Sequence, residues 1–402
     1  MNSQEILVSV QLGAENIRVG TLWCHVRKGR ESASFQYDDT WLSHPEKFAL
    51  EPALQLTQGA FHTHNTLALF GAIGDSAPDR WGRMLMRRHH ASHSTLFESD
   101  YLLGVNDLTR QGALRFSLPE ATETYLASAT QHAIPPLLEL PKLLAASEHV
   151  IANEESTEDL KMLLAPGSSL GGARPKASIF DRHSALAIAK FPRKDDEYAV
   201  VIWEAIALKL ASMAGIKTTQ WRLEHILNKP VLVIQRFDRK AQHRIPFVSA
   251  MSMLGAVDNE QHSYLEIADA IRQFGAQPQQ DLTELWRRIV FNIMIANTDD
   301  HLRNHGFLYH REQGWTLSPA YDLNPTPLSI KPKFLSTAID LTETAADIDV
   351  ALSVATQFNL NATQAKSIIA EIQQAVKQWP QIAKQYGLSQ QECAFMASAF
   401  VH

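Results

Sequence analysis

The pattern of hydrophobic and polar positions divides the chain into a strand-rich beginning and a largely helical end. Near the start, short apolar stretches separated by polar or glycine-containing breaks predict strands over residues 6–12, 17–26 and 32–37. A helix is then predicted to begin near Pro78, because proline fits the first turn of a helix and a polar capping pattern precedes it. We expect these elements to form an N-terminal domain over residues 1–145.

Beyond residue 145 the pattern predicts two lobes of different structure. One long helix over residues 198–214, ended by Gly215, follows the helical apolar repeat. Alternating segments predict strands around that helix, at residues 177–180, 185–190, 221–226 and 230–236. Helical spacing returns over residues 265–274 and 282–296 and through the last sixty or so residues.

The predicted fold class is therefore α+β. We expect a strand-rich N-terminal domain followed by a bilobal domain over residues 146–402, with the small lobe at about 146–238 and a mostly helical lobe at about 239–402.

Composition narrows the class of protein. Hydrophobic residues make up 45% of the 402 residues and charged residues 20%, which is typical of a globular protein and excludes disorder. The net charge of −6 argues against binding to a nucleic-acid backbone by this chain alone. Two cysteines are too few for a disulfide framework, and the chain shows neither a cationic leader nor an apolar run long enough to cross a membrane. We expect a cytoplasmic protein without membrane contact.

The chemically most informative segment lies between residues 298 and 322. Asp299 is followed five positions later by Asn304, and Asp322 comes after two strand-like stretches at 306–308 and 315–317. Protein kinases place one carboxylate at the acceptor hydroxyl and two oxygen ligands on magnesium in this order. Asp and Asn also cap turns, so the motif needs further kinase features to be convincing.

Two such features occur upstream. Residues 167–176 form a glycine-containing loop, and Lys190 ends the alternating segment that follows it. A kinase needs a loop over the ATP phosphates and a lysine that contacts them. Taken singly, a glycine pair usually marks a tight turn, and a lysine at a strand end is usually solvated. Glu204 on the long helix is either a partner of Lys190 or an ordinary helix position.

Six motifs in the same order resemble the HipA family of serine/threonine kinases, the toxins of bacterial toxin–antitoxin modules. They are residues 78–83 (PDRWGR), 169–176 (SLGGARPK), 189–192 (AKFP), 233–239 (VIQRFDR), 298–304 (TDDHLRN) and Tyr321-Asp322. The resemblance implies an ATP-dependent kinase with a protein-kinase-like fold that uses Mg²⁺. It also implies a small HipB-like helix-turn-helix antitoxin, so that DNA is contacted only indirectly through that partner. The best-known members phosphorylate a translation-related protein, an aminoacyl-tRNA synthetase, and thereby favour persistence.

The same resemblance assigns roles to individual residues. Asp299 resembles the catalytic aspartate, Lys190 the lysine on the ATP phosphates, and His301 a histidine close to those phosphates. Asn304 and Asp322 resemble the magnesium ligands, and Ser169 matches a serine that the family autophosphorylates, with Ser168 as the rival position. The remaining residues implied for nucleotide binding are Gly171, Gly172, Ala173, Lys176, Gln235 and Phe237.

The chain departs from some relatives at Gln235, where they have Glu; a backbone hydrogen bond to adenine survives that change, whereas a side-chain contact could differ. Two other functions stay open from the sequence. One is a nucleotide-binding co-repressor scaffold with little catalysis, and the other is a kinase that phosphorylates a small molecule.

Overall fold

The computed structural model describes residues 2–64, 67–90, 95–122, 124–127, 134–167, 172–241, 243–311 and 313–400. The chain forms two compact units. The first contains Met1–Lys194 and Glu224–Val257, and the second contains Asp195–Leu223 and Asp258–His402. The predicted domain boundary near residue 145 falls inside the first unit, so the N-terminal region and most of the predicted small lobe share one compact body.

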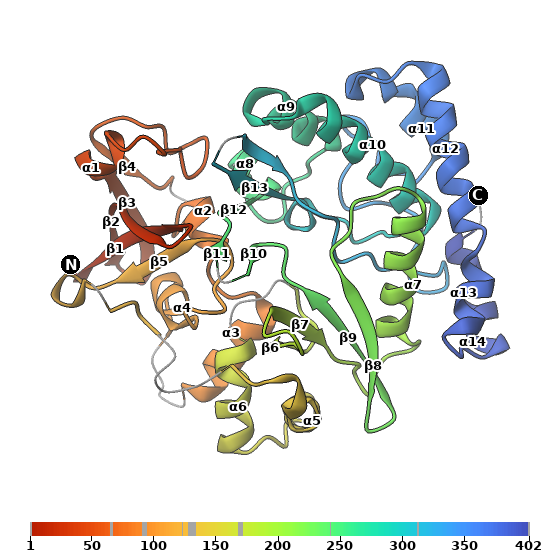
Figure 1. The fold of residues 1–402 in the computed structure, drawn as a ribbon, viewed down its shortest axis with the longest axis horizontal. Coiled ribbons are helices and arrows are strands. Elements are labelled where there is room, and N and C mark those ends of the chain that lie inside the picture. Colours follow the sequence, from red (N-terminus) through yellow and green to blue (C-terminus); the bar gives the residue numbers. More distant parts are fainter. Residues whose placement is uncertain are drawn as a thin grey trace. The chain divides into compact units, whose positions relative to one another are not determined.

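The first unit begins with a five-stranded sheet in the order β4-β3-β2-β1-β5 (Figure 1). Its strands are β1 Asn2–Leu12, β2 Glu15–Arg27, β3 Arg30–Tyr37, β4 Ala60–His62 and β5 Leu114–Ser117. All its neighbouring strands run antiparallel. The three strands predicted at the start of the chain are confirmed. β1 begins four residues earlier than predicted because its polar start pairs with β2, as in Asn2 opposite Val26.

Short helices connect this sheet to the rest of the first unit. They are α1 Asp39–Leu42, α2 Gly71–Gly74, α3 Arg80–His89, α4 Glu98–Gly104 and the 3₁₀ turn η1 Pro119–Ala121. The helix predicted near Pro78 is α3, and the Asp79 carboxylate caps it by accepting a 2.7 Å hydrogen bond from the Gly82 amide. Such a cap satisfies one of the amides that a helix start leaves unpaired.

A second sheet, in the order β6-β7-β9-β8, forms the predicted small lobe. Its strands are β6 Lys176–Phe180, β7 Leu186–Lys190, β8 Trp221–Ile226 and β9 Lys229–Gln235. Helices α5 Leu140–Ala152 and α6 Thr157–Gly167 lie beside one another in Figure 1, and η2 Leu137–Glu139 precedes them. The first unit ends with β10 Arg239–Lys240, β11 His243–Arg244, β12 Phe247–Ser249 and α8 Ala250–Leu254.

One hydrophobic core joins this sheet to the N-terminal region. Trp81 and Leu85 of α3 pack in the same cluster as Leu143 of α5, Ala189 of β7 and Val233 of β9. All five side chains are almost fully buried. Because burial of large apolar side chains is the main force that stabilises a fold, we expect these segments to fold together rather than as independent domains.

The second unit is mostly helical. Its helices are α7 Val200–Met213, α9 Tyr264–Phe274, α10 Pro278–Met294, α11 Ile348–Ser353, α12 Ala362–Val376, α13 Trp379–Gln385 and α14 Gln390–Met396, with 3₁₀ turns η3 Leu302–Asn304, η4 Ala355–Phe358 and η5 Ala397–Phe400. A hairpin of β13 Gly306–His310 and β14 Gly314–Leu317 adds two antiparallel strands. The strand-rich beginning and the helical end expected from the sequence are confirmed.

Helix α7 is buried along most of its length because later helices cover it. It packs against α12 and α13, which lie next to it in Figure 1. Trp203 of α7 contacts Trp379 and Phe400, with ring centroids 5.9 Å and 5.7 Å apart. Among the residues that the structure describes, no helix is both long and apolar enough to cross a bilayer.

The buried carboxyl of Glu51, in the first unit, should make the stability of this fold depend on pH. Its side chain is 5% exposed and accepts a hydrogen bond from the Ala72 amide, yet burial and, more weakly, Asp75 raise its pKa to about 7. A carboxyl whose pKa rises on folding binds its proton more tightly in the folded state, so stability falls as pH rises from about 4.5 to 7.

We expect the wild-type chain to lose on the order of 3 kcal/mol of unfolding free energy across this interval from Glu51 alone. The substitution Glu51→Gln should flatten the dependence. Urea unfolding at several pH values measures it, and an equally steep profile in Glu51→Gln would contradict the assignment.

Candidate active site

The loop that follows α10 presents Asp299 to solvent while burying its neighbours. Asp299 is exposed, whereas Thr298, Asp300 and Asn304 are buried. Asn304 donates from Nδ2 to the Asp299 carbonyl at 3.1 Å, and its own amide donates to the His301 carbonyl at 2.8 Å. These two bonds close the loop into a compact turn. The turn leaves the Asp299 side chain exposed to solvent.

A buried polar cluster that the sequence analysis did not single out holds this loop in place. The Asp300 carboxylate lies 2.8 Å from Nε2 of His305 and accepts a 2.5 Å hydrogen bond from the Tyr264 hydroxyl. Its carbonyl accepts another from Thr337 at 2.7 Å. Burial alone would raise the pKa of Asp300. The charge and hydrogen bond of His305, together with the hydrogen bond from Tyr264, outweigh burial and lower that pKa.

The signal for this cluster in the sequence is the second aspartate of the 298–304 motif with a histidine five positions later. Burial and an opposing carboxylate also raise the pKa of Tyr264 well above its usual value, which keeps its proton available for Asp300. Asp300 therefore holds the loop through buried contacts, whereas the Asp299 side chain stays exposed.

Asp322 is held next to the same loop. The Tyr321 hydroxyl donates to the Arg303 carbonyl at 2.7 Å, so the residues immediately before Asp322 and before Asn304 are joined directly. The Asn324 amide reaches Oδ1 of Asn297 at 3.2 Å from the other side. Asp322 adopts φ of +59°, a left-handed conformation that Asp tolerates better than most residues. The segments that bear Asn304 and Asp322 are therefore joined within the second unit through Tyr321, and the shared role predicted for Asp299, Asn304 and Asp322 stays a prediction.

This arrangement fits a magnesium ion of the kind that kinases use. Asn304 already uses its Nδ2 atom within the loop, which leaves the amide oxygen, a hard ligand, for a cation. Asp322 supplies a carboxylate on the neighbouring segment. In the described part of the chain, no group of three or more His, Cys, Asp or Glu residues could form a closed metal cage. Magnesium bound through one or two protein oxygens plus substrate phosphates needs no such cage.

His301 lies between Asp299 and Asn304 in the sequence. Its side chain is half-buried, and its Nδ1 atom is buried without a hydrogen-bond partner among the described residues. An unpaired polar atom beside a predicted phosphate site is consistent with a role toward a ligand. That role stays a prediction.

The first unit carries the residues predicted to hold the nucleotide. Lys190 ends β7 and lies opposite Lys176 of β6 in the strand pairing. Gly172 and Ala173 are exposed, and Gly172 has φ of +97°, which glycine adopts without strain. Ser169 and Gly171 lie outside the described residues. Glu204 belongs to the second unit, where it is buried, and its pairing with Lys190 stays a prediction.

Lys176 has a structural partner that the sequence analysis did not anticipate. Its Nζ lies 2.9 Å from Oδ2 of Asp79, the cap of α3, and the side chain is 3% exposed. Trp81 donates from its indole nitrogen to the Lys176 carbonyl at 3.0 Å. Burial raises the pKa of Asp79, with the Lys176 charge opposing it. Lys176 thus fixes the end of the glycine loop to α3, and any contact with a nucleotide would come in addition to that ion pair.

Gln235 and Phe237 lie where β9 ends. The Gln235 side chain is 3.4 Å from Oδ2 of Asp181, in the turn between β6 and β7, and the Phe237 ring is 6.1 Å from the ring of Phe247. The backbone of residues 235–237 is the part that the adenine prediction requires.

Comparison with known proteins identifies the family. The family model of the HipA-like C-terminal domain matches residues 168–379, more than half of the chain, and that of the HipA N-terminal domain matches residues 10–117. The chain belongs to the HipA family. A chain of the Shewanella oneidensis MR-1 toxin–antitoxin complex of HipA, HipB and operator DNA superposes with a TM-score of 0.69. The superposition covers 98% of this chain and 94% of the Shewanella chain at 18% identity, which shows a shared fold.

Two sequence relatives carry kinase descriptions. "Putative kinase Y4mE" of Sinorhizobium fredii is 27% identical over 150 residues, which cover 35% of this chain and 34% of the relative. A "Putative kinase" of Haemophilus influenzae is 38% identical over 101 residues, which cover 22% of this chain and 29% of the relative. The match thus spans about a third of the length of these relatives. The HipA-family membership expected from the motifs is confirmed.

Proposed function

We propose that this HipA-family chain is an ATP-dependent serine/threonine protein kinase and the toxin of a toxin–antitoxin module. The observation that supports the proposal is a pair of hydrogen bonds: Asn304 to the Asp299 carbonyl closes the loop that bears both residues, and Tyr321 to the Arg303 carbonyl joins that loop to the segment that bears Asp322. An ordinary capped turn does not require an exposed carboxylate between buried neighbours, nor a bond from that loop to the segment of a second aspartate. Kinase chemistry requires both.

In this mechanism the Asp299 carboxylate accepts a hydrogen bond from the acceptor hydroxyl and takes its proton as the γ-phosphoryl group is transferred. Lys190 binds the ATP phosphates, and His301 lies close to them. Asn304 and Asp322 would hold Mg²⁺, which when bound supplies positive charge to the phosphates. Catalysis then rests mainly on positioning, and the Asp300 cluster preserves that positioning by keeping the loop rigid.

The proposed partners follow from the family. The Shewanella structure contains HipB and operator DNA. We propose a HipB-like helix-turn-helix antitoxin for this chain, with DNA contacted only through it, and a cytoplasmic location. The proposed acceptor is a protein of translation, with an aminoacyl-tRNA synthetase as the first candidate.

Incubation of the purified chain with γ-labelled ATP and Mg²⁺, alone and with a cell lysate, tests the activity. Label on serine or threonine of a protein supports the proposal. ATP binding without transfer would indicate a co-repressor scaffold instead, and label on a small molecule would indicate a small-molecule kinase.

Ser169 provides a second test. We expect mass spectrometry to find phosphate on Ser169 in active protein and none in Asp299→Ala, with much weaker ATP binding by the modified form. Phosphate adds a charge of about −1.5 to −2 beside the nucleotide phosphates, and the repulsion should displace the loop. Ser168→Ala is the matched control, which should still be modified. Phosphate on Ser168 alone, or tight ATP binding by chain phosphorylated at Ser169, would contradict this prediction.

A further inference from the structure

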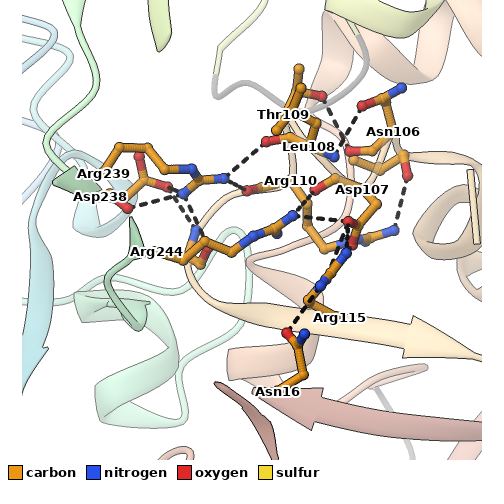
Figure 2. Close-up of polar contacts among 12 residues, drawn as sticks. Asn16, Asn106, Asp107, Leu108, Thr109, Arg110, Arg115, Asp238, Arg239 and Arg244 are labelled. Carbon is orange, nitrogen blue, oxygen red and sulfur yellow. Dashed lines mark hydrogen bonds and ion pairs between the residues drawn. The ribbon is translucent and has the colours of Figure 1, made fainter. Parts of the chain in front are cut away.

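The segment that leaves β9 is held by a loop of the N-terminal region (Figure 2). We call residues 235–239 the hinge segment and residues 106–112 the clamp loop. Arg239 donates to the carbonyls of Leu108, Arg110 and Gly112 at 3.1, 2.6 and 3.1 Å. Arg236 donates to the Thr109 carbonyl at 2.5 Å. Two arginines of the hinge segment thus bind four main-chain carbonyls of a loop more than 120 residues away in sequence.

Asp238 completes the contact between the two segments. Its carboxylate pairs with Arg236 at 2.5 Å and Arg239 at 2.7 Å and accepts a 2.8 Å hydrogen bond from the Gly112 amide. Burial opposes the charged form, yet these cations lower the pKa of Asp238 far below its usual range. The side chain of Asp238 is 3% exposed. A buried carboxylate with several charge-assisted hydrogen bonds fixes geometry strongly, because losing any partner leaves a charge unpaired.

The clamp loop is itself rigid. Arg110 is fully buried, donates to the carbonyls of Ser76 and Val105 at 3.0 Å each, and stacks 4.7 Å above the Phe116 ring. Gly112 adopts φ of +73°, and a Cβ there would approach the Phe247 amide nitrogen to 3.2 Å. The loop is therefore held by several contacts in addition to those with the hinge segment.

A second carboxylate ties the neighbouring strand to the same loop. Asp107 pairs with Arg115 at 2.6 Å and with Arg244 of β11 at 2.9 Å, and Arg244 also donates to the Asp107 carbonyl at 2.6 Å. Figure 2 shows Arg244 bound to Asp107 and Arg239 bound to carbonyls of the same clamp loop. Both sides of the hinge segment's exit from β9 are thus anchored on the N-terminal region.

We infer that the clamp loop is a positioning element of the nucleotide site: it sets the backbone of residues 235–237 and so determines affinity for the purine base and the choice of adenine over guanine. The inference rests on the proposed kinase function and on the adenine contact that the family resemblance implies for that backbone. None of the clamp residues touches the nucleotide in this scheme. They act through the hinge segment.

The test is titration of Mg²⁺-ATP and Mg²⁺-GTP by calorimetry against full-length variants. Arg239→Lys keeps the charge but loses the fork that reaches three carbonyls. We expect it to weaken ATP binding about tenfold, as for one or two lost hydrogen bonds, and to weaken GTP binding less, so that the ATP/GTP ratio falls. Arg110→Lys loosens the clamp loop without touching residues 235–239 by its side chain, and should shift the ratio in the same direction.

Arg18→Lys is the matched control. Arg18 is a part-buried arginine of the N-terminal sheet, paired with Asp38 at 3.1 Å, and it takes no part in the clamp. It should leave both affinities unchanged even where it lowers the melting temperature. Unchanged ATP/GTP ratios in both clamp variants would overturn the inference, whereas transfer of label from γ-labelled ATP by the wild-type chain would still uphold the proposed function. If Arg239→Lys does not fold, Arg110→Lys decides. Failure of the wild-type chain to bind either nucleotide would reject the proposed function, and the inference with it.

Discussion

The substitution Asp299→Ala is expected to reduce phosphoryl transfer by at least about a thousandfold, within the range attributed to general-base catalysis. ATP binding should stay within about tenfold of wild type, because in the proposed mechanism Asp299 acts on the acceptor whereas Lys190, the glycine loop and Mg²⁺ hold the nucleotide. The structure explains why the fold should survive. Asp299 is exposed, and the loop is held by Asp300, whose carboxylate contacts His305 and Tyr264.

Transfer of label from γ-labelled ATP measures the rate, and calorimetry measures the binding. The matched control is Asp269→Ala, which removes an exposed aspartate of α9 that pairs only with Arg272 on the same helix among the described residues. The control should retain activity. Wild-type transfer rates in Asp299→Ala would show that the catalytic carboxylate has been assigned to the wrong residue.

The substitution Asp322→Ala should weaken both nucleotide binding in the presence of Mg²⁺ and turnover, each by about ten- to a hundredfold or more. Removing one of two protein oxygens leaves Asn304 as the only fixed ligand. Unlike Asp299→Ala, this change should reduce the benefit that Mg²⁺ brings to ATP binding. Titrations of ATP at several Mg²⁺ concentrations separate the two effects.

The left-handed backbone at Asp322 requires a second variant. Alanine at φ of +59° carries a strain of roughly 1–2 kcal/mol, whereas glycine carries none. Asp322→Gly therefore removes the carboxylate without adding strain. If the carboxylate matters, both variants lose the same Mg²⁺ dependence. Recovery in Asp322→Gly would instead assign the loss to the backbone, and unchanged Mg²⁺ dependence in both would place the metal ligand elsewhere.

Local patterns were sufficient for the elements and for the motif residues. Strands β1–β3 and helices α7, α9 and α10 appear within a few residues of their predicted bounds, because apolar periodicity follows from which face of an element is buried. Helices α5 and α6 were not predicted, because Pro135 and Pro136 before them and the acidic residues 154–158 between them are typical of a junction between domains. Their apolar faces belong to the core that also contains Trp81 and Val233.

The sequence by itself determined the kinase-like order of Lys190, Asp299, Asn304 and Asp322. Such chemistry needs particular residue types at short spacings along the chain, and both can be recognised without the tertiary structure. Only the tertiary structure decided which polar residues support that chemistry from a distance. Asp79 pairs with Lys176, Asp300 with His305, and Asp238 with two arginines and the Gly112 amide. The sequence does not distinguish an aspartate that is exposed to water from one that is buried beside a cation. Its role depends on desolvation and on partners that folding brings together, which no local pattern encodes.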